Sequence, residues 1–104
     1  MATLYITELK AIQVTSRAWG SQGFIQAAAM PPVAEQTVSI GGSSTQSSAF
    51  NAATTFVRLH CDAICSIEFG TNPTATTSTA RMIAGQTEYF GVSPGMKVAV
   101  ITNT

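Results

Sequence analysis

The chain has 104 residues, of which 45% are hydrophobic and only 10% are charged, and its five basic residues balance five acidic residues. A chain of this length folds around one core, so we expect a single domain over residues 1–104. Zero net charge with scattered cations argues against nucleic acid or an anionic membrane surface as a partner. Weak like-charge repulsion also favours an assembled protein, a homo-oligomer, over a free monomer with a hydroxyl-rich surface.

The start of the chain, "MATLYITELK", lacks the basic segment and the apolar stretch of an export signal. No apolar run approaches the roughly 18 residues that are needed to span a bilayer. We therefore expect synthesis in a cytoplasm, with both cysteines reduced.

The first predicted strand is "TLYITEL", in which side chains alternate between two faces. The two faces carry Leu4 and Ile6 on one side, and Tyr5, Thr7 and Leu9 on the other. The following "AIQVT" either continues this strand or pairs beside it. "SRAWGSQGF" is typical of a loop with aromatic anchors. "FIQAAAMPP" ends at two prolines that push the preceding residue toward extended geometry, so we expect a strand or an extended arm there.

The middle of the chain predicts further strands separated by loops. "EQTVSIGG" alternates, with Val38 and Ile40 on one face, and "GGSSTQSS" is typical of a flexible loop. Two more strands are expected on either side of a tight connection near residues 62–63. Their proposed inner faces are Val57, Leu59 and Cys61 in the first strand, and Cys65, Ile67 and Phe69 in the second. The hydroxyl-rich "GTNPTATTSTA" predicts a loop with local side-chain to backbone bonds, and "RMIAG" a short strand.

The last two strands, "TEYFGV" and "KVAVIT", flank a Ser-Pro-Gly-Met turn. Pro94 fixes φ and Gly95 supplies the positive φ of a type II turn, so we expect a hairpin whose register this turn sets. Both faces of the final strand are apolar, which predicts a strand that is central in its sheet or covered on both sides. In all, about seven or eight short antiparallel strands are expected, which indicates an all-β domain, either a β-sandwich or a jelly-roll-like barrel.

"HCD", at residues 60–62, has the composition of a catalytic site. A Cys–His pair needs the imidazole within hydrogen-bond reach of the sulfur, but neighbours on a strand point to opposite faces. We therefore expect His60 and Cys61 to diverge. Cys61 and Cys65 cannot supply four zinc ligands with one histidine, and in an extended chain they lie about 13 Å apart, so we interpret them as structural thiols.

Three further groups of residues are weaker candidates for a functional site. Glu68 and Glu88 could meet across a sheet as an acid–base pair, although solvated surface residues are the simpler interpretation. Four aromatic residues could form a sugar-binding platform or belong to a core or a subunit contact: Tyr5, Trp19, Phe24 and Tyr89. The small-residue segments 41–55 and 71–80 could pack against a neighbouring subunit or form mobile loops. We predict no catalytic, cofactor-binding or metal-binding residues, and no cofactor.

The run "FVRLHCDAICSIEFGTNPTATTSTARMIAGQTEYFGVSPGMKVAVI" resembles small structural proteins encoded by tailed bacteriophages and prophages. The resemblance lies in a "VRL" strand, an "FG.NPTAT" loop, an "R.AG..EYF" strand and a closing "PG.K.AVI" strand. It covers a little under half of the chain, and these motifs relate to fold and not to reactivity. The resemblance implies a β-sandwich or jelly-roll subunit of the capsid cement or decoration class, which binds the major capsid protein or other virion proteins, and itself.

The sequence therefore predicts a non-enzymatic virion protein, made in the cytoplasm of a host bacterium, that stabilises a capsid shell. A receptor-binding or glycan-binding β-module at a tail or fibre is the alternative. An enzyme or accessory lysis factor is a third class, which would need reactive side chains gathered in one place.

Overall fold

The computed structural model describes residues 2–16 and 24–103, with the side chains of residues 13–26 left undescribed. The described chain is all-β, as predicted, and no helix in it is long or apolar enough to cross a membrane. The described residues form ten strands, where seven or eight were expected. They are β1 (Thr3–Leu9), β2 (Ile12–Ser16), β3 (Phe24–Ala28), β4 (Ala34–Ser39), β5 (Thr45–Gln46), β6 (Phe56–Cys61), β7 (Cys65–Gly70), β8 (Ala80–Met82), β9 (Thr87–Gly91) and β10 (Lys97–Thr102).

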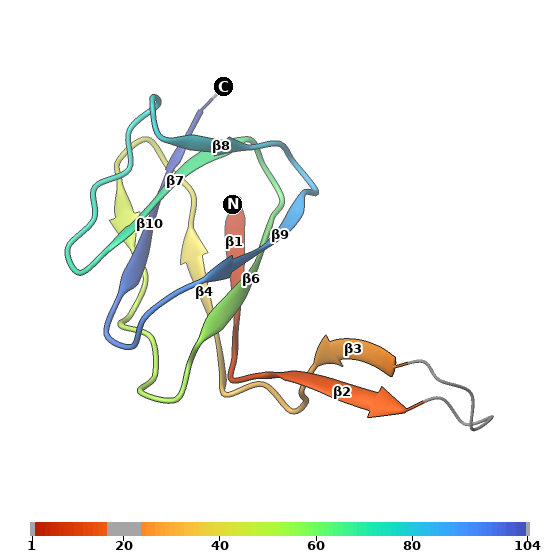
Figure 1. Ribbon diagram of the computed structural model, residues 1–104. Helices are drawn as coiled ribbons and strands as arrows, with labels where there is room; N and C mark the ends of the chain where they lie inside the picture. The colour runs from red at the N-terminus through yellow and green to blue at the C-terminus, as the bar shows by residue number, and fades with distance from the viewer. Residues whose placement is uncertain (1, 17–23, 104) are drawn as a thin grey trace.

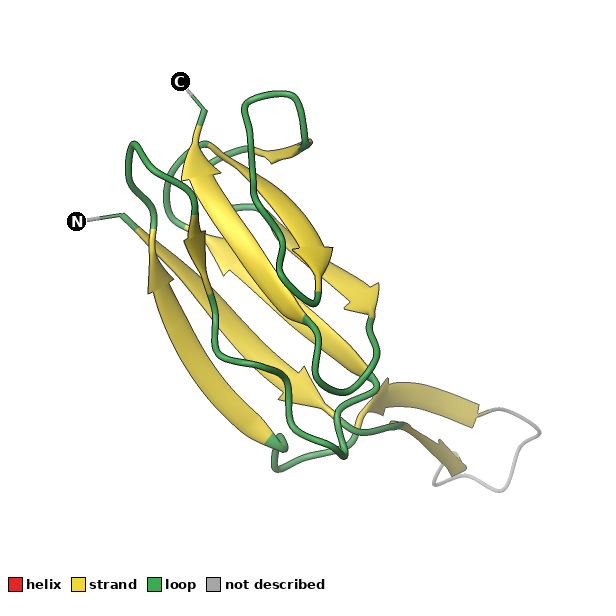
Figure 2. Ribbon diagram, turned by 90° about the vertical axis from the view of Figure 1, so that its left-hand side faces the viewer, coloured by secondary structure: helices red, strands yellow, loops and turns green. Residues whose placement is uncertain are grey.

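Eight of these strands form two antiparallel sheets of four, which confirms the β-sandwich alternative. Sheet I has the order β4-β1-β6-β9 and sheet II has the order β5-β10-β7-β8. The two layers lie face to face (Figure 2). Each sheet therefore has an inner face, which contacts the other sheet, and an outer face, which points away from it.

The remaining two strands, β2 and β3, pair with each other and form an arm that projects from the sandwich (Figure 1). The arm lies between β1 and β4 in the chain, and these two strands pair side by side in sheet I. The radius of gyration is 15.3 Å, against about 13 Å for a compact domain of this length. The principal extents of 52 × 27 × 22 Å likewise agree with one projecting element.

The core lies between the sheets and follows the predicted alternation. Val57, Leu59 and Cys61 of β6 are fully buried, whereas Phe56, Arg58 and His60 are partly exposed. The same pattern buries Leu4 and Ile6 of β1 and Val38 of β4. The last strand, β10, lies between β5 and β7 and buries Val98, Ala99 and Val100, so the prediction of a central strand is confirmed.

The predicted closing hairpin is wrong, although its turn is correct. Gly95 has φ of +84° and the Met96 amide donates to the Ser93 carbonyl at 3.2 Å, as in a type II turn. However, β9 pairs with β6 in sheet I, while β10 pairs with β5 and β7 in sheet II. A type II turn splays its flanking strands, because its twist does not match that of a two-residue hairpin. The turn therefore belongs to an arch that carries the chain from one sheet to the other.

Two other loop predictions need adjustment. The connection at residues 62–64 is tight, as expected, but it also crosses between the sheets, so β6 and β7 are not neighbours. The segment expected to be a flexible loop contains β5, whose Thr45 and Gln46 pair with β10. A two-residue strand is too short to show alternation, so the sequence pattern could not reveal it.

The turn assignment can be tested with two glycines that differ in backbone conformation. Neither Gly95 nor Gly42 has an atom within 4 Å of an added Cβ, but only Gly95 has a positive φ. Gly95→Val should therefore lower the free energy of unfolding by about 1–3 kcal/mol, because a β-branched residue is strained at positive φ. Gly42→Val should change it by less than about 0.5 kcal/mol. Urea unfolding followed by circular dichroism measures both, and equal effects would contradict the assignment.

Candidate functional site

His60, Cys61 and Asp62 do not form a site together. His60 lies on the outer face of sheet I, where its Nδ1 is 2.7 Å from Thr87 Oγ1. Cys61 points into the core and its thiol donates to the Ile83 carbonyl at 3.1 Å. Asp62 accepts a 2.6 Å hydrogen bond from the Thr3 amide. The predicted divergence of imidazole and thiol is confirmed.

Cys61 and Cys65 both face the core and both are free thiols. Burial, together with the neighbouring Cys61 thiol, raises the pKa of Cys65 to about 12. Cys65 is therefore protonated at neutral pH, and a protonated thiol is a poor nucleophile and a poor metal ligand. Within the described residues, no group of three or more His, Cys, Asp or Glu side chains could hold a metal ion.

The two carboxylates considered as an acid–base pair are in different sheets. Glu68 lies on β7 in sheet II, Glu88 lies on β9 in sheet I, and both are exposed. The simpler interpretation, that they are surface residues, is supported.

The two small-residue segments contact each other within the chain. Ser44 Oγ accepts from the Ala75 amide at 2.9 Å, and Gln46 donates to Asn72 Oδ1 and to the Pro73 carbonyl at 2.9 and 2.8 Å. Local bonds within residues 76–79 also form as predicted. The two segments are therefore held to each other by hydrogen bonds within the chain.

The aromatic candidates divide into two groups. Tyr5 and Tyr89 are exposed on the outer face of sheet I, at 44% and 58% of their surface. The prediction for Trp19 lies outside the described residues, and for Phe24 only the backbone, at the start of β3, is described. Phe56 lies near Tyr89, with ring centroids 6.4 Å apart. Tyr5, Phe56 and Tyr89 therefore contribute to one exposed apolar surface on the outer face of sheet I.

A buried carboxylate, Glu8, is the polar centre that the sequence analysis missed. Glu8 is only 3% exposed and lies on β1, on the same side as Leu4 and Ile6. Its Oε1 accepts from the Asn51 amide and from Thr54 Oγ1, both at 2.8 Å, and its Oε2 accepts from Gln36 Nε2 at 3.0 Å. The period-two alternation of "TLYITEL" places residue 8 on the inner face, so this signal was present in the sequence.

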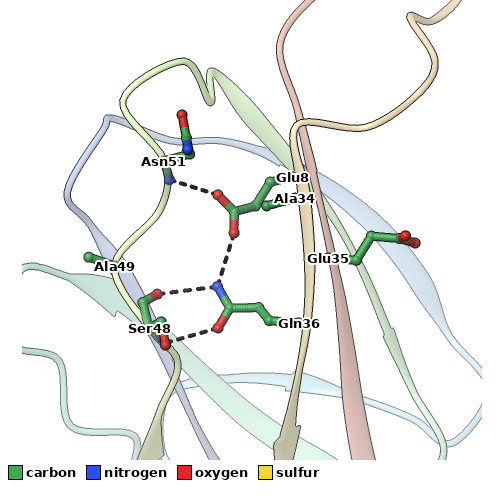
Figure 3. Close-up of a pocket in the computed structure, with 7 residues that line it drawn as sticks. All are labelled: Glu8, Ala34, Glu35, Gln36, Ser48, Ala49 and Asn51. Atoms are coloured by element: carbon green, nitrogen blue, oxygen red, sulfur yellow. Dashed lines mark hydrogen bonds between the residues drawn. The ribbon is translucent and has the colours of Figure 1, made fainter.

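The Glu8 network holds the segment that joins the two sheets. Gln36 is itself fixed at both ends of its amide, because Nε2 donates to the Ser48 carbonyl at 3.3 Å and Oε1 accepts from the Ser48 amide at 2.9 Å. These bonds connect β1 and β4 to the chain between β5 and β6 (Figure 3). No cation neutralises Glu8 among these partners, so neutral donors provide its solvation in place of water.

The hollow beside Glu8 has a volume of about 310 Å³ and is lined by residues of β1, β4 and the 48–51 segment. Both oxygens of Glu8 are already engaged, and the nearby Glu35 side chain points away from it (Figure 3). The arrangement therefore suits a structural acceptor and does not pair two carboxylates across a reaction centre.

No family model, curated protein or solved structure matches the chain.

Replacing Glu8 with alanine should lower the free energy of unfolding by about 3 kcal/mol, because three donors lose their acceptor at partly buried positions. Glu88→Ala, which removes an exposed carboxylate from the same sheet, should change it by less than about 0.5 kcal/mol. Urea titrations of both variants provide the comparison. Equal stability of the two variants would show that the Glu8 network does not hold the fold.

Proposed function

We propose that this chain is a non-enzymatic structural protein of a tailed-bacteriophage virion, a capsid cement or decoration protein that binds the major capsid protein and stabilises the shell. Such a protein is made in the host cytoplasm and resides in the assembled particle. It acts by binding, because each copy adds contact area across a joint between shell subunits and many copies act together.

The observation that carries this proposal is the projecting arm. In the described part of the chain, β2 and β3 pair with each other and with no strand of the sandwich. An isolated two-stranded hairpin is only marginally stable in water, so an arm of this kind gains stability when it packs against another surface. An arm that extends from a compact sandwich has the reach to contact a neighbouring shell subunit.

Three further observations support the same proposal. The sequence of residues 56–101 resembles phage structural proteins in its strand and loop motifs. The protein has zero net charge, which suits a subunit that is surrounded by other proteins. Both carboxylate oxygens of Glu8 accept hydrogen bonds from neighbouring segments, as expected of a side chain that has a structural role.

The alternative, a glycan-binding or receptor-binding module of a tail or fibre, is favoured by one observation. Tyr5 and Tyr89 expose aromatic rings on the same outer face. Exposed aromatic rings can stack on the apolar faces of sugars, and also form protein–protein contacts.

Particles of the phage that carries this gene should contain the protein in their heads, in a number of copies comparable to that of the shell protein. Quantitative mass spectrometry of separated heads and tails measures this distribution. Absence from particles would contradict the proposal, and presence in tails alone would favour the alternative.

A matched arm deletion tests the role of the arm in the same experiment. Glu8 and Ala34 are paired neighbours, so residues 11–32 can be replaced by a short Asn-Gly turn. This variant should keep the β-sheet circular dichroism spectrum but lose at least about nine-tenths of its binding to heads. Unchanged binding by the folded variant would show that the arm is not the contact.

A further inference from the structure

The outer face of sheet I carries one charged residue of each sign in a single cross-strand row. Thr7 of β1 is directly opposite Glu35 of β4 on one side and Arg58 of β6 on the other, and Arg58 is opposite Tyr89 of β9. The row therefore reads Glu35–Thr7–Arg58–Tyr89 across the four strands. Since adjacent strands are about 4.8 Å apart, the two charged residues are centred on β1 and separated by roughly 10 Å.

Neither charge is neutralised within the described chain. Glu35 is exposed and Arg58 is partly exposed, and neither forms an ion pair with another described residue. Both line a hollow of about 330 Å³ together with Tyr5, Thr7 and His60. Two charges that face solvent on a flat sheet have room to pair with groups outside the chain.

Apolar surface surrounds this pair of charges. A second hollow of about 330 Å³ joins Glu35 and Arg58 to Leu9, Ala28, Met30 and Tyr89, at the base of the arm. Met30 and Tyr89 are exposed over 67% and 58% of their surface, and Ile12 nearby over 55%. Exposed apolar side chains gathered around a few polar groups are typical of a protein–protein contact.

The placement of the charges selects a second copy of the same chain as the occupant. In such a dimer the outer faces of the two copies of sheet I face each other, and the two-fold axis runs parallel to β1 in the plane midway between them. Rotation about this axis exchanges the positions of β4 and β6, the strands on either side of β1. It therefore brings Glu35 of each copy opposite Arg58 of the other, and each contact occurs twice, as symmetry requires. Facing sheets pack about 10 Å apart, a distance that a glutamate and an arginine side chain can bridge together.

We propose that the outer face of sheet I is the contact between two copies of this chain, with Glu35 of each copy paired with Arg58 of the second copy. This inference rests on the proposed function together with the homo-oligomer expected from the sequence, and it identifies the surface that would form the contact between copies. The base of the arm, at Ile12, Ala28 and Met30, borders this surface, so the proposed dimer contact and the proposed shell contact adjoin each other.

A charge-exchange experiment tests this contact on the full-length protein. Sedimentation velocity should show a dimer for the native chain, and Glu35→Lys or Arg58→Glu alone should raise the dissociation constant at least about 100-fold, because like charges then face each other twice. Mixing the two variants in equal amounts should restore the dimer. In the mixed dimer the introduced lysine faces the introduced glutamate, and the native Arg58 of one copy faces the native Glu35 of the other. Glu68→Lys, on the outer face of sheet II, should leave the dimer unchanged.

Two outcomes would overturn the inference: a native chain that is monomeric at high concentration, or folded single variants whose mixture does not associate. If Arg58→Glu fails to fold, Tyr5→Lys provides a substitution at an exposed position near the axis, and a dimer that survives it would overturn the inference equally. A dimer that is absent from purified particles would defeat the virion role alone. A monomer that is present in heads would defeat this inference alone.

Discussion

The packing of the two sheets against each other is the interaction on which the rest of the structure depends. Each sheet of this protein has an inner face that is apolar, and neither face could remain in water without the other. The chain crosses between the two sheets repeatedly, for example through the connections at residues 62–64 and 92–96. No single sheet is therefore a continuous piece of the sequence, and the two layers must form together.

The same packing explains why a carboxylate is buried. Glu8 continues the inner-face alternation of β1 to the rim of the core, where the 47–55 segment passes between the sheets. Three neutral donors replace the water that the carboxylate loses. This polar rim fixes the connecting segment, while the apolar core supplies the main driving force for folding.

The packing also determines which surfaces are available for binding. The inner face of sheet I is occupied by sheet II, and the segments around Ser44 and Ala75, which flank strands of sheet II in the chain, are held to each other by a hydrogen bond. The outer face of sheet I and the projecting arm carry the largest exposed apolar side chains apart from Ile83 among the described residues. The proposed dimer contact and the proposed shell contact therefore use the two parts of the molecule that the fold leaves open.

Sequence reasoning succeeded where several residues alternate and failed where pairing depends on distant partners. The alternation of Val57, Leu59 and Cys61 identified an inner face and the divergence of His60 from Cys61. The local turn at Gly95 was also predictable, since only its backbone conformation mattered. The partners of β9 and β10 were not predictable, because strands that look like a hairpin in sequence can belong to different sheets. The Glu8 network was missed for a related reason, since its donors are 28, 43 and 46 residues away along the chain.

The most direct test of the closed core is the reactivity of the two native thiols. Cys61 and Cys65 lie between the sheets, out of reach of solvent. Native protein exposed to a maleimide at neutral pH, and counted by intact-mass spectrometry, should stay unlabelled over a period that fully modifies a cysteine peptide, and should take up two labels in denaturant. Labelling of either thiol in the folded protein at the rate of the peptide would contradict the account.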